Sequence, residues 1–133
     1  MQHALFAYGT LCLPEVMRLV TGRAFASEDA WLEGYERFRL RRRVYPGMVW
    51  TGEGVTRGRL YSGIDPASLD RIDAYEGEPY RRIDVRPRLA DGTPVQAVTY
   101  VLLESLHHLL GGKDWDEEEF RRRHLRQYLR REV

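Results

Sequence analysis

Cysteine and lysine are almost absent from this chain of 133 residues, which has one cysteine, Cys12, and one lysine, Lys113. A single cysteine excludes an internal disulfide and a cysteine-based metal site, and it suits a reducing compartment. The remaining basic residues are arginines, and the formal net charge is only +1. Because nucleic-acid binding usually needs a net basic face, and the arginine clusters lie beside acids, we expect no nucleic-acid partner.

Long apolar runs are also absent. No stretch approaches the roughly 20 apolar residues that span a bilayer, and the N-terminal MQHALFAYGT lacks the basic segment and apolar run of a signal peptide. We therefore expect no membrane partner and a cytoplasmic location. The length and an ordinary composition predict one domain over residues 1–133. The pattern leaves the oligomeric state open.

Helix signals occur at three places. Pro14 suits the first turn of a helix that ends before Gly22. Asp65, followed by Pro66, predicts the start of a second helix that runs to Glu76. A third helix is predicted from residue 116, where an aspartate and a glutamate three residues later form a capping-box pattern, flanked by the apolar pair of a hydrophobic staple.

Short apolar or alternating segments between these helices predict strands. The segments are residues 3–8, 31–40 with a bend at Gly34, 54–64, 80–88 and 95–103. Asp91-Gly92 predicts a hairpin between the last two, and Pro46-Gly47 is a turn signal. The order lacks the regular alternation of a doubly wound sheet, so we expect an α+β fold, a mixed β-barrel or sheet of about five to six strands with flanking helices.

Glu76 is the first candidate for chemistry. Leu69, Ile72 and Glu76 are spaced i, i+3 and i+7 and therefore share one helix face. A carboxylate on a core-facing stripe is costly unless it is paired or used. Burial and the negative end of the helix should raise its pKa, which suits a general base. The alternative, which spacing alone favours, is a structural glutamate paired with an arginine such as Arg81 or Arg42.

Residues 8–11 (YGTL) are a second candidate, because they lie between the first strand and the first helix. Glycine there permits close backbone approach, and N–H groups at such a turn hold carboxylates or developing oxyanions. An ordinary strand-to-helix turn is the alternative. Cys12 follows directly, but a cysteine nucleophile needs a partner such as histidine, and no pattern places one beside it. We expect a buried cysteine.

Taken together, these features resemble the gamma-glutamylcyclotransferase-like family, which is also known from plant avirulence-induced proteins. The resemblance is carried by YGTL at residues 8–11 and by DAYEGEPYRR at residues 73–82. Shorter segments extend it over residues 6–101: YPG at 45–47, GRLY at 58–61 and AVTYV at 97–101. The resemblance implies a mixed β-barrel with flanking helices and a pocket at one end, lined by residues 8–11 and faced by Glu76.

The family's reaction releases 5-oxoproline from a gamma-glutamyl compound and frees an amine or amino acid. The resemblance implies that Glu76 is the catalytic base, and that neither a metal nor a cofactor is required. The substrate-binding residues that it implies are Tyr8, Gly9, Thr10, Leu11, Tyr80 and Tyr100. The only partner expected is a small gamma-glutamyl substrate.

Three points stay open at the level of sequence. The alternative function is that of a non-catalytic member that binds a small ligand or a partner. The leaving amine is not determined, and its selection is expected at a rim formed by residues 41–48 and 103–113. Arg42 or Arg43 could bind a substrate carboxylate, but no pattern selects either of them.

Overall fold

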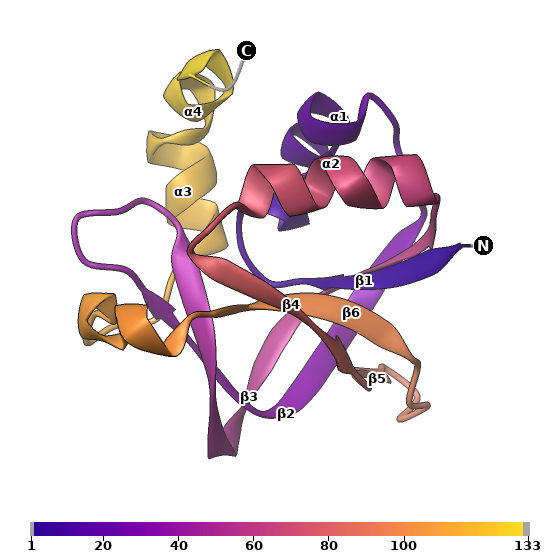
Figure 1. Cartoon of the computed structure of the whole chain (residues 1–133), viewed down its shortest axis with the longest axis horizontal. Coiled ribbons are helices and arrows are strands. Elements are labelled where there is room, and N and C mark those ends of the chain that lie inside the picture. The colour runs from indigo at the N-terminus through magenta and orange to yellow at the C-terminus, as the bar shows by residue number, and fades with distance from the viewer. Residues whose placement is uncertain (1, 132–133) are drawn as a thin grey trace.

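Six strands form one mixed sheet, in the order β4-β6-β1-β3-β2-β5, in the computed structural model, which describes residues 2–131 (Figure 1). The strands are β1 (His3–Ala7), β2 (Ser27–Arg39), β3 (Pro46–Ile64), β4 (Tyr80–Val85), β5 (Arg88–Leu89) and β6 (Ala97–Leu102). Strands β1 and β6 are parallel, and the other neighbouring pairs are antiparallel. The predicted α+β class with a mixed sheet is confirmed.

The two edges of this sheet lie close together, although the sheet does not close into a barrel. Strand β4 ends at Val85 on one edge, and β5 begins at Arg88 on the other. Three peptide steps span at most roughly 11 Å, so the sheet must be strongly curled. Because β4 and β5 are not paired with each other, an open curled sheet replaces the expected barrel.

Strand β1 is buried on both of its faces. Leu5 and Ala7 contribute to the core between the sheet and the helices, whereas Phe6 and Tyr8 belong to a second core inside the curl. Side chains alternate across a strand, and a strand covered on both faces is apolar throughout. This double burial explains why the segment has no polar alternation in its sequence.

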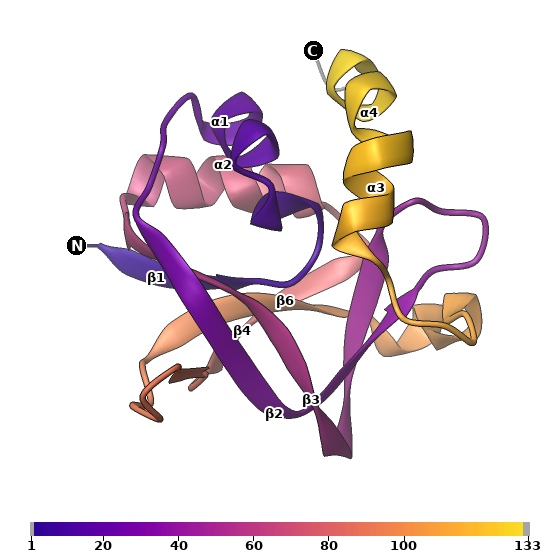
Figure 2. The ribbon, with the colours of Figure 1, turned by 180° about the vertical axis from the view of Figure 1, so that it is seen from behind.

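The helices cover one side of the sheet. Figures 1 and 2 show α1 (Pro14–Thr21) and α2 (Pro66–Glu76) side by side over β1, and α3 (Glu117–Arg123) and α4 (Leu125–Arg131) next to them. Two 3-10 helices complete the fold, η1 (Thr10–Cys12) and η2 (Glu104–Leu109). No helix within residues 2–131 is long and apolar enough to cross a membrane.

The predicted helix starts are confirmed, but the last helix is interrupted. Asp116 Oδ1 accepts a hydrogen bond from the backbone N–H of Glu119 at 3.0 Å, and the rings of Trp115 and Phe120 pack at 5.7 Å between centroids. At His124 the backbone leaves the helical region (φ −124°), which separates α3 from α4. No proline or glycine marks this break, so the sequence carried no sign of it.

The turn predicted at Pro46-Gly47 is wrong. Both residues are buried and begin β3, where a proline is tolerated as the first residue of a strand. The chain reverses earlier, at Arg41-Arg42, with Arg42 in the left-handed region (φ 59°). Strands β2 and β3 are consequently longer than predicted, and the bend at Gly34 is confirmed by its φ of 84° and the register shift beside it.

The predicted pairing of β4 with β6 is confirmed, with Tyr80 opposite Leu102 and Val85 opposite Ala97. The turn at Asp91-Gly92 closes a smaller loop than expected. Before this turn the chain forms β5, which leaves the hairpin and pairs with β2. The predicted strand over residues 80–88 therefore ends three residues earlier, because the curl of the sheet carries the chain to the opposite edge.

Candidate active site

A cavity of about 180 Å³ lies beyond the C-terminal end of β1, between the loop that follows β1, the end of α2, the start of β4 and a residue of α4. It contains every site residue that the sequence predicted: Tyr8, Gly9, Thr10, Leu11, Glu76, Tyr80 and Tyr100. Three of these are tyrosines, and three further tyrosines join them in the lining. Tyrosines are therefore the commonest residues in the walls, and they bring six hydroxyl groups to the site.

Glu76 is the last residue of α2, and Gly77 turns the chain away with a φ of 72°. Leu69 and Ile72 on the same helix face are buried in the core, and Glu76 is half-buried and lines the cavity. Its carboxylate has no hydrogen-bond or ion-pair partner among the side chains that the structure describes. The alternative of an arginine partner is therefore wrong for Arg81 and Arg42, both of which are exposed.

Burial raises the pKa of Glu76 from 4.5 to about 8. A carboxyl group in this range exchanges its proton close to neutral pH, which is the property required of a general base. The pKa values of Tyr8, Tyr80 and Tyr100 are also raised, chiefly by burial and further by the charge of Glu76. These tyrosines therefore stay protonated beside the carboxylate.

Gly9 is required because the ring of Pro46 lies directly against its backbone. A Cβ at this position would lie 2.9 Å from Cγ of Pro46, nearer than real Cβ contacts allow. Pro46 also lines the cavity. Any side chain at Gly9 would therefore push the loop of residues 8–11 away from β3 and deform the cavity.

In the backbone of this loop, the carbonyl groups are hydrogen-bonded and, within the part of the chain that the structure describes, the N–H groups of residues 9–11 are not. The carbonyls of Gly9 and Thr10 accept from backbone N–H groups at 2.9 and 3.1 Å, and the carbonyl of Leu11 accepts from the Tyr61 hydroxyl at 2.6 Å. The N–H groups of Gly9, Thr10 and Leu11 have no acceptor among residues 2–131. The loop lines the cavity and thus has N–H donors available for a ligand. Such donors suit an anionic ligand group.

The three predicted tyrosines are fixed by their own hydroxyl groups. Tyr8 donates to the carbonyl of Tyr100 at 2.6 Å, and Tyr80 donates to the carbonyl of Pro46 at 2.7 Å. Tyr100 donates to Asp73, which also pairs with Arg82 at 2.7 Å. Their rings consequently form rigid walls, and Tyr100 lines the cavity and packs in the core at the same time.

Two cavity tyrosines were missed from the sequence, Tyr75 and Tyr128. The hydroxyl of Tyr75 is hydrogen-bonded to Thr10 Oγ1 at 2.7 Å and to the hydroxyl of Tyr128. Tyr128 continues a packing stripe with Phe120 and His124, which contact one another as their spacing predicts. Nothing in that stripe distinguishes its last member as a cavity residue.

Cys12 is buried, as predicted. Its thiol donates to the carbonyl of Ala7 at 3.0 Å, and burial raises its pKa to about 12. Because the thiolate is the nucleophilic form, this environment does not produce a reactive cysteine.

The predicted rim is present in part. Tyr45 and Pro46 from the segment 41–48 line the cavity, whereas residues 103–113 do not. Arg42 and Arg43 are exposed and also lie outside the lining. The positive charge of Arg43 nevertheless lowers the pKa of Tyr80 against the larger effect of burial, so it lies within electrostatic reach of the site.

Comparison with known proteins places the sequence in a family. The family described as gamma-glutamyl cyclotransferase, AIG2-like, matches residues 5–117. AIG2-like protein A of Arabidopsis thaliana is 31% identical over 128 residues, which cover 96% of this chain and 77% of that protein. A solution structure of an Arabidopsis thaliana protein superposes with a TM-score of 0.77 at 28% identity and covers 98% of this chain and 79% of that one.

A solved structure described as a gamma-glutamyl cyclotransferase superposes with a TM-score of 0.69. It is 17% identical and covers 77% of this chain and 68% of its own, so it shows the shared fold alone. Because the family match extends over most of the sequence, the chain belongs to the gamma-glutamyl cyclotransferase, AIG2-like family.

Proposed function

We propose that the chain cyclises a small gamma-glutamyl compound and releases 5-oxoproline together with an amine or amino acid. The observation that carries this proposal is the carboxylate of Glu76, which has no partner among the described side chains and lines a tyrosine-walled cavity. Burying a carboxylate without a partner lowers the stability of the fold. We therefore infer that Glu76 is kept at this position for a role in chemistry. We expect the reaction in the cytoplasm.

The reaction needs one group that both accepts and returns a proton. The substrate's α-ammonium loses a proton to Glu76, and the resulting amine attacks the γ-carbonyl carbon, forming a C–N bond and a tetrahedral oxyanion. The bond to the leaving nitrogen then breaks as Glu76 returns the proton to it. The new ring nitrogen gives up its second proton to the released amine, which departs as an ammonium ion, so the protons balance. Since the attack is intramolecular, holding the folded conformer removes much of the entropic barrier, and no metal or cofactor is required.

The loop and the tyrosines supply the remaining parts. The N–H groups of residues 9–11 are donors for the developing oxyanion or for the substrate carboxylate. An apolar cavity of about 150 Å³ holds benzene, so this cavity of about 180 Å³ takes a group of similar size. The glutamyl half of the substrate fits that size, and the leaving group then extends past Tyr45 and Pro46.

An assay for 5-oxoproline tests the proposal. The purified protein is incubated with a panel of gamma-glutamyl amino acids, peptides and amines, and Glu76→Gln serves as the control. Release by the wild type and not by the variant supports the reaction and the base together. Binding of 5-oxoproline or glutamate with no turnover of any compound would instead favour a non-catalytic binding protein with the same fold.

A further inference from the structure

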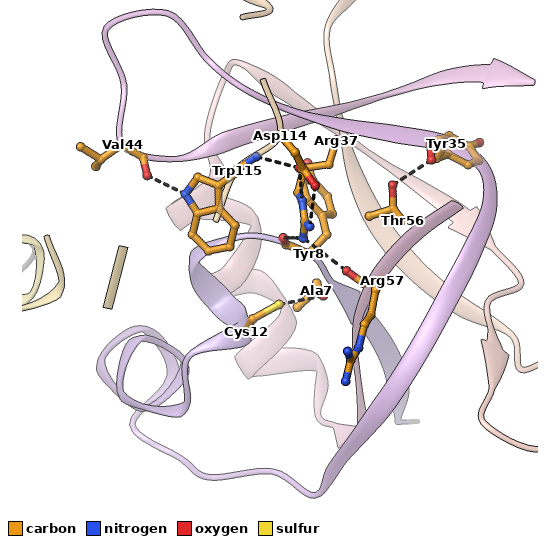
Figure 3. A network of polar contacts seen from close by, with 10 residues as sticks. All are labelled: Ala7, Tyr8, Cys12, Tyr35, Arg37, Val44, Thr56, Arg57, Asp114 and Trp115. Atoms are coloured by element: carbon orange, nitrogen blue, oxygen red, sulfur yellow. Dashed lines mark hydrogen bonds and ion pairs between the residues drawn. The ribbon is translucent and has the colours of Figure 1, made fainter. Parts of the chain in front are cut away.

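Arg37 of β2 contacts the active-site loop from outside the cavity. Its Nη1 donates to the carbonyl of Tyr8 at 2.8 Å and to the carbonyl of Arg57 at 3.3 Å, and the side chain is 17% exposed. Figure 3 shows it between Asp114 and Tyr8. Arg37 does not line the cavity, so any effect on a ligand must pass through the loop.

The guanidinium is held firmly on its other side. Its Nε and Nη2 donate to the two carboxylate oxygens of Asp114 at 2.8 and 3.2 Å, and it lies 5.7 Å from the ring centroid of Trp115. Trp115 is itself fixed, because its Nε1 donates to the carbonyl of Val44 at 2.7 Å. A bidentate carboxylate pair and an aromatic face together give Arg37 one defined position.

The carbonyl that Arg37 binds belongs to the same peptide group as the N–H of Gly9. In a trans peptide the C=O and N–H point in opposite directions, so a carbonyl held by Arg37 directs the N–H away from it. Gly9 lines the cavity, and its N–H has no acceptor within residues 2–131. A charged donor on the carbonyl also polarises the peptide and makes its N–H a stronger donor.

We propose that Arg37 is a positioning residue, which orients and polarises the Tyr8–Gly9 peptide so that the Gly9 N–H meets the oxyanion formed in the cavity. This inference rests on the proposed function for the identity of the oxyanion. The orientation and polarisation of the peptide can be measured without any ligand.

Arg57 offers a matched control on the neighbouring strand. It pairs with Asp29 at 3.0 Å and lies 5.8 Å from the ring centroid of Trp31, so it makes the same kinds of contact as Arg37, although its side chain is 66% exposed. Its side chain makes no hydrogen bond to the loop. Arg57→Met therefore removes one arginine charge, one ion pair and one ring contact without removing a side-chain hydrogen bond to the Tyr8–Gly9 peptide.

The test uses Arg37→Met and Arg57→Met in the full chain. In ligand-free protein, we expect the amide resonance of Gly9 in a ¹H–¹⁵N spectrum to move upfield in Arg37→Met and to stay in place in Arg57→Met. With the best gamma-glutamyl substrate, kcat should fall about tenfold in Arg37→Met with a smaller change in KM. Loss of a whole oxyanion donor costs roughly 10²–10³ in kcat, and a weakened donor costs less.

Arg37→Lys keeps the charge without the forked geometry and should recover part of kcat, and it replaces Arg37→Met if that variant does not fold. A Gly9 resonance that does not move in the Arg37 variant overturns the proposal, whether or not the protein is active. An active enzyme whose kcat is equal in the two methionine variants overturns it as well. If the wild type turns over no compound, the proposed function fails, and the Gly9 resonance alone decides whether Arg37 polarises the peptide.

Discussion

The two ends of α2 carry carboxylates in opposite states. At the N-terminal end, Asp65 accepts hydrogen bonds from the Ser68 hydroxyl at 2.7 Å and the Ser68 N–H at 3.1 Å, and it pairs with Arg23 at 3.1 Å. The hydrogen bonds from Ser68 are the main reason that its pKa falls to about 2. At the C-terminal end, burial without a described partner raises the pKa of Glu76 to about 8.

The contrast shows how one residue class serves structure or chemistry according to the donors around it. Asp65 has enough donors to stay ionised at every physiological pH, so it can only cap the helix. Glu76 lacks them and titrates near neutrality, where proton transfer is useful. The helix dipole acts in the same two directions, favouring negative charge at the N-terminus and disfavouring it at the C-terminus.

Replacing each carboxyl group by an amide gives the largest expected contrast. Glu76→Gln should lower kcat/KM roughly 10²–10⁴-fold, because the amide cannot accept the substrate's proton. Asp65→Asn should leave kcat/KM unchanged, since asparagine also caps helices well. Steady-state release of 5-oxoproline by both variants measures the difference.

Circular dichroism confirms that both variants are folded before the rates are compared. Equal rates for Glu76→Gln and the wild type would remove the base from the mechanism. A comparable loss in both variants would mean that α2 matters through its stability, and the contrast between its two ends would lose its functional meaning.

Stability as a function of pH should also separate the two carboxylates. Unfolded Glu76 loses its proton near pH 4.5, whereas folded Glu76 keeps it to about pH 8. Between these values the unfolded state binds fewer protons, so the free energy of unfolding falls as pH rises. Glu76→Gln avoids this loss, and above pH 8 it should exceed the wild type by on the order of 2–3 kcal/mol, relative to their difference at pH 4.

Urea denaturation of the wild type and Glu76→Gln at pH 4, 6, 8 and 9 measures this change. Asp65 acts in the opposite direction: its contribution is present above its ordinary pKa of 3.8 and is lost as pH falls toward 2. A difference between Glu76→Gln and the wild type that does not vary with pH would show that Glu76 has an ordinary pKa in the folded protein.

Helix α2 could be predicted from the sequence because its signals are local. Asp65, Pro66 and Gly77 mark its ends, and the spacing of Leu69, Ile72 and Glu76 places the acid on the buried face. That no described arginine side chain pairs with Glu76 could not be predicted, because the partner depends on where other strands bring their side chains. Spacing alone favoured the wrong alternative here.

The parts that were missed depend on contacts between distant segments. Pro46 begins a strand because it packs against Gly9, which lies 37 positions earlier, and no local signal reports that contact. Tyr128 reaches the cavity because α4 stands beside the end of α2 (Figure 1). The short β5 exists only because the sheet curls far enough to bring its edges together. Tertiary placement, not propensity, decided all three.

The smallest expected effect concerns Tyr128 of α4. Its hydroxyl is hydrogen-bonded to that of Tyr75 near the C-terminal end of α2. Tyr128→Phe removes the hydroxyl that is bonded to Tyr75 and keeps the ring, whose centroid is 5.3 Å from that of Phe120. Tyr75 retains its bond to Thr10 Oγ1. Loosening of the Tyr75 hydroxyl beside the loop should lower kcat/KM roughly threefold, which corresponds to about 0.7 kcal/mol.

Tyr35→Phe is the matched control, because Tyr35 packs on Trp50 at 5.1 Å between centroids and does not line the cavity. It should have no effect on kcat/KM. If Tyr128→Phe also leaves kcat/KM unchanged, the chemistry at this end of α2 depends on Glu76 and the loop of residues 8–11. Helix α4 would then only cover the core. A loss as large as that of Glu76→Gln would instead place the Tyr128 hydroxyl in direct contact with the reacting atoms.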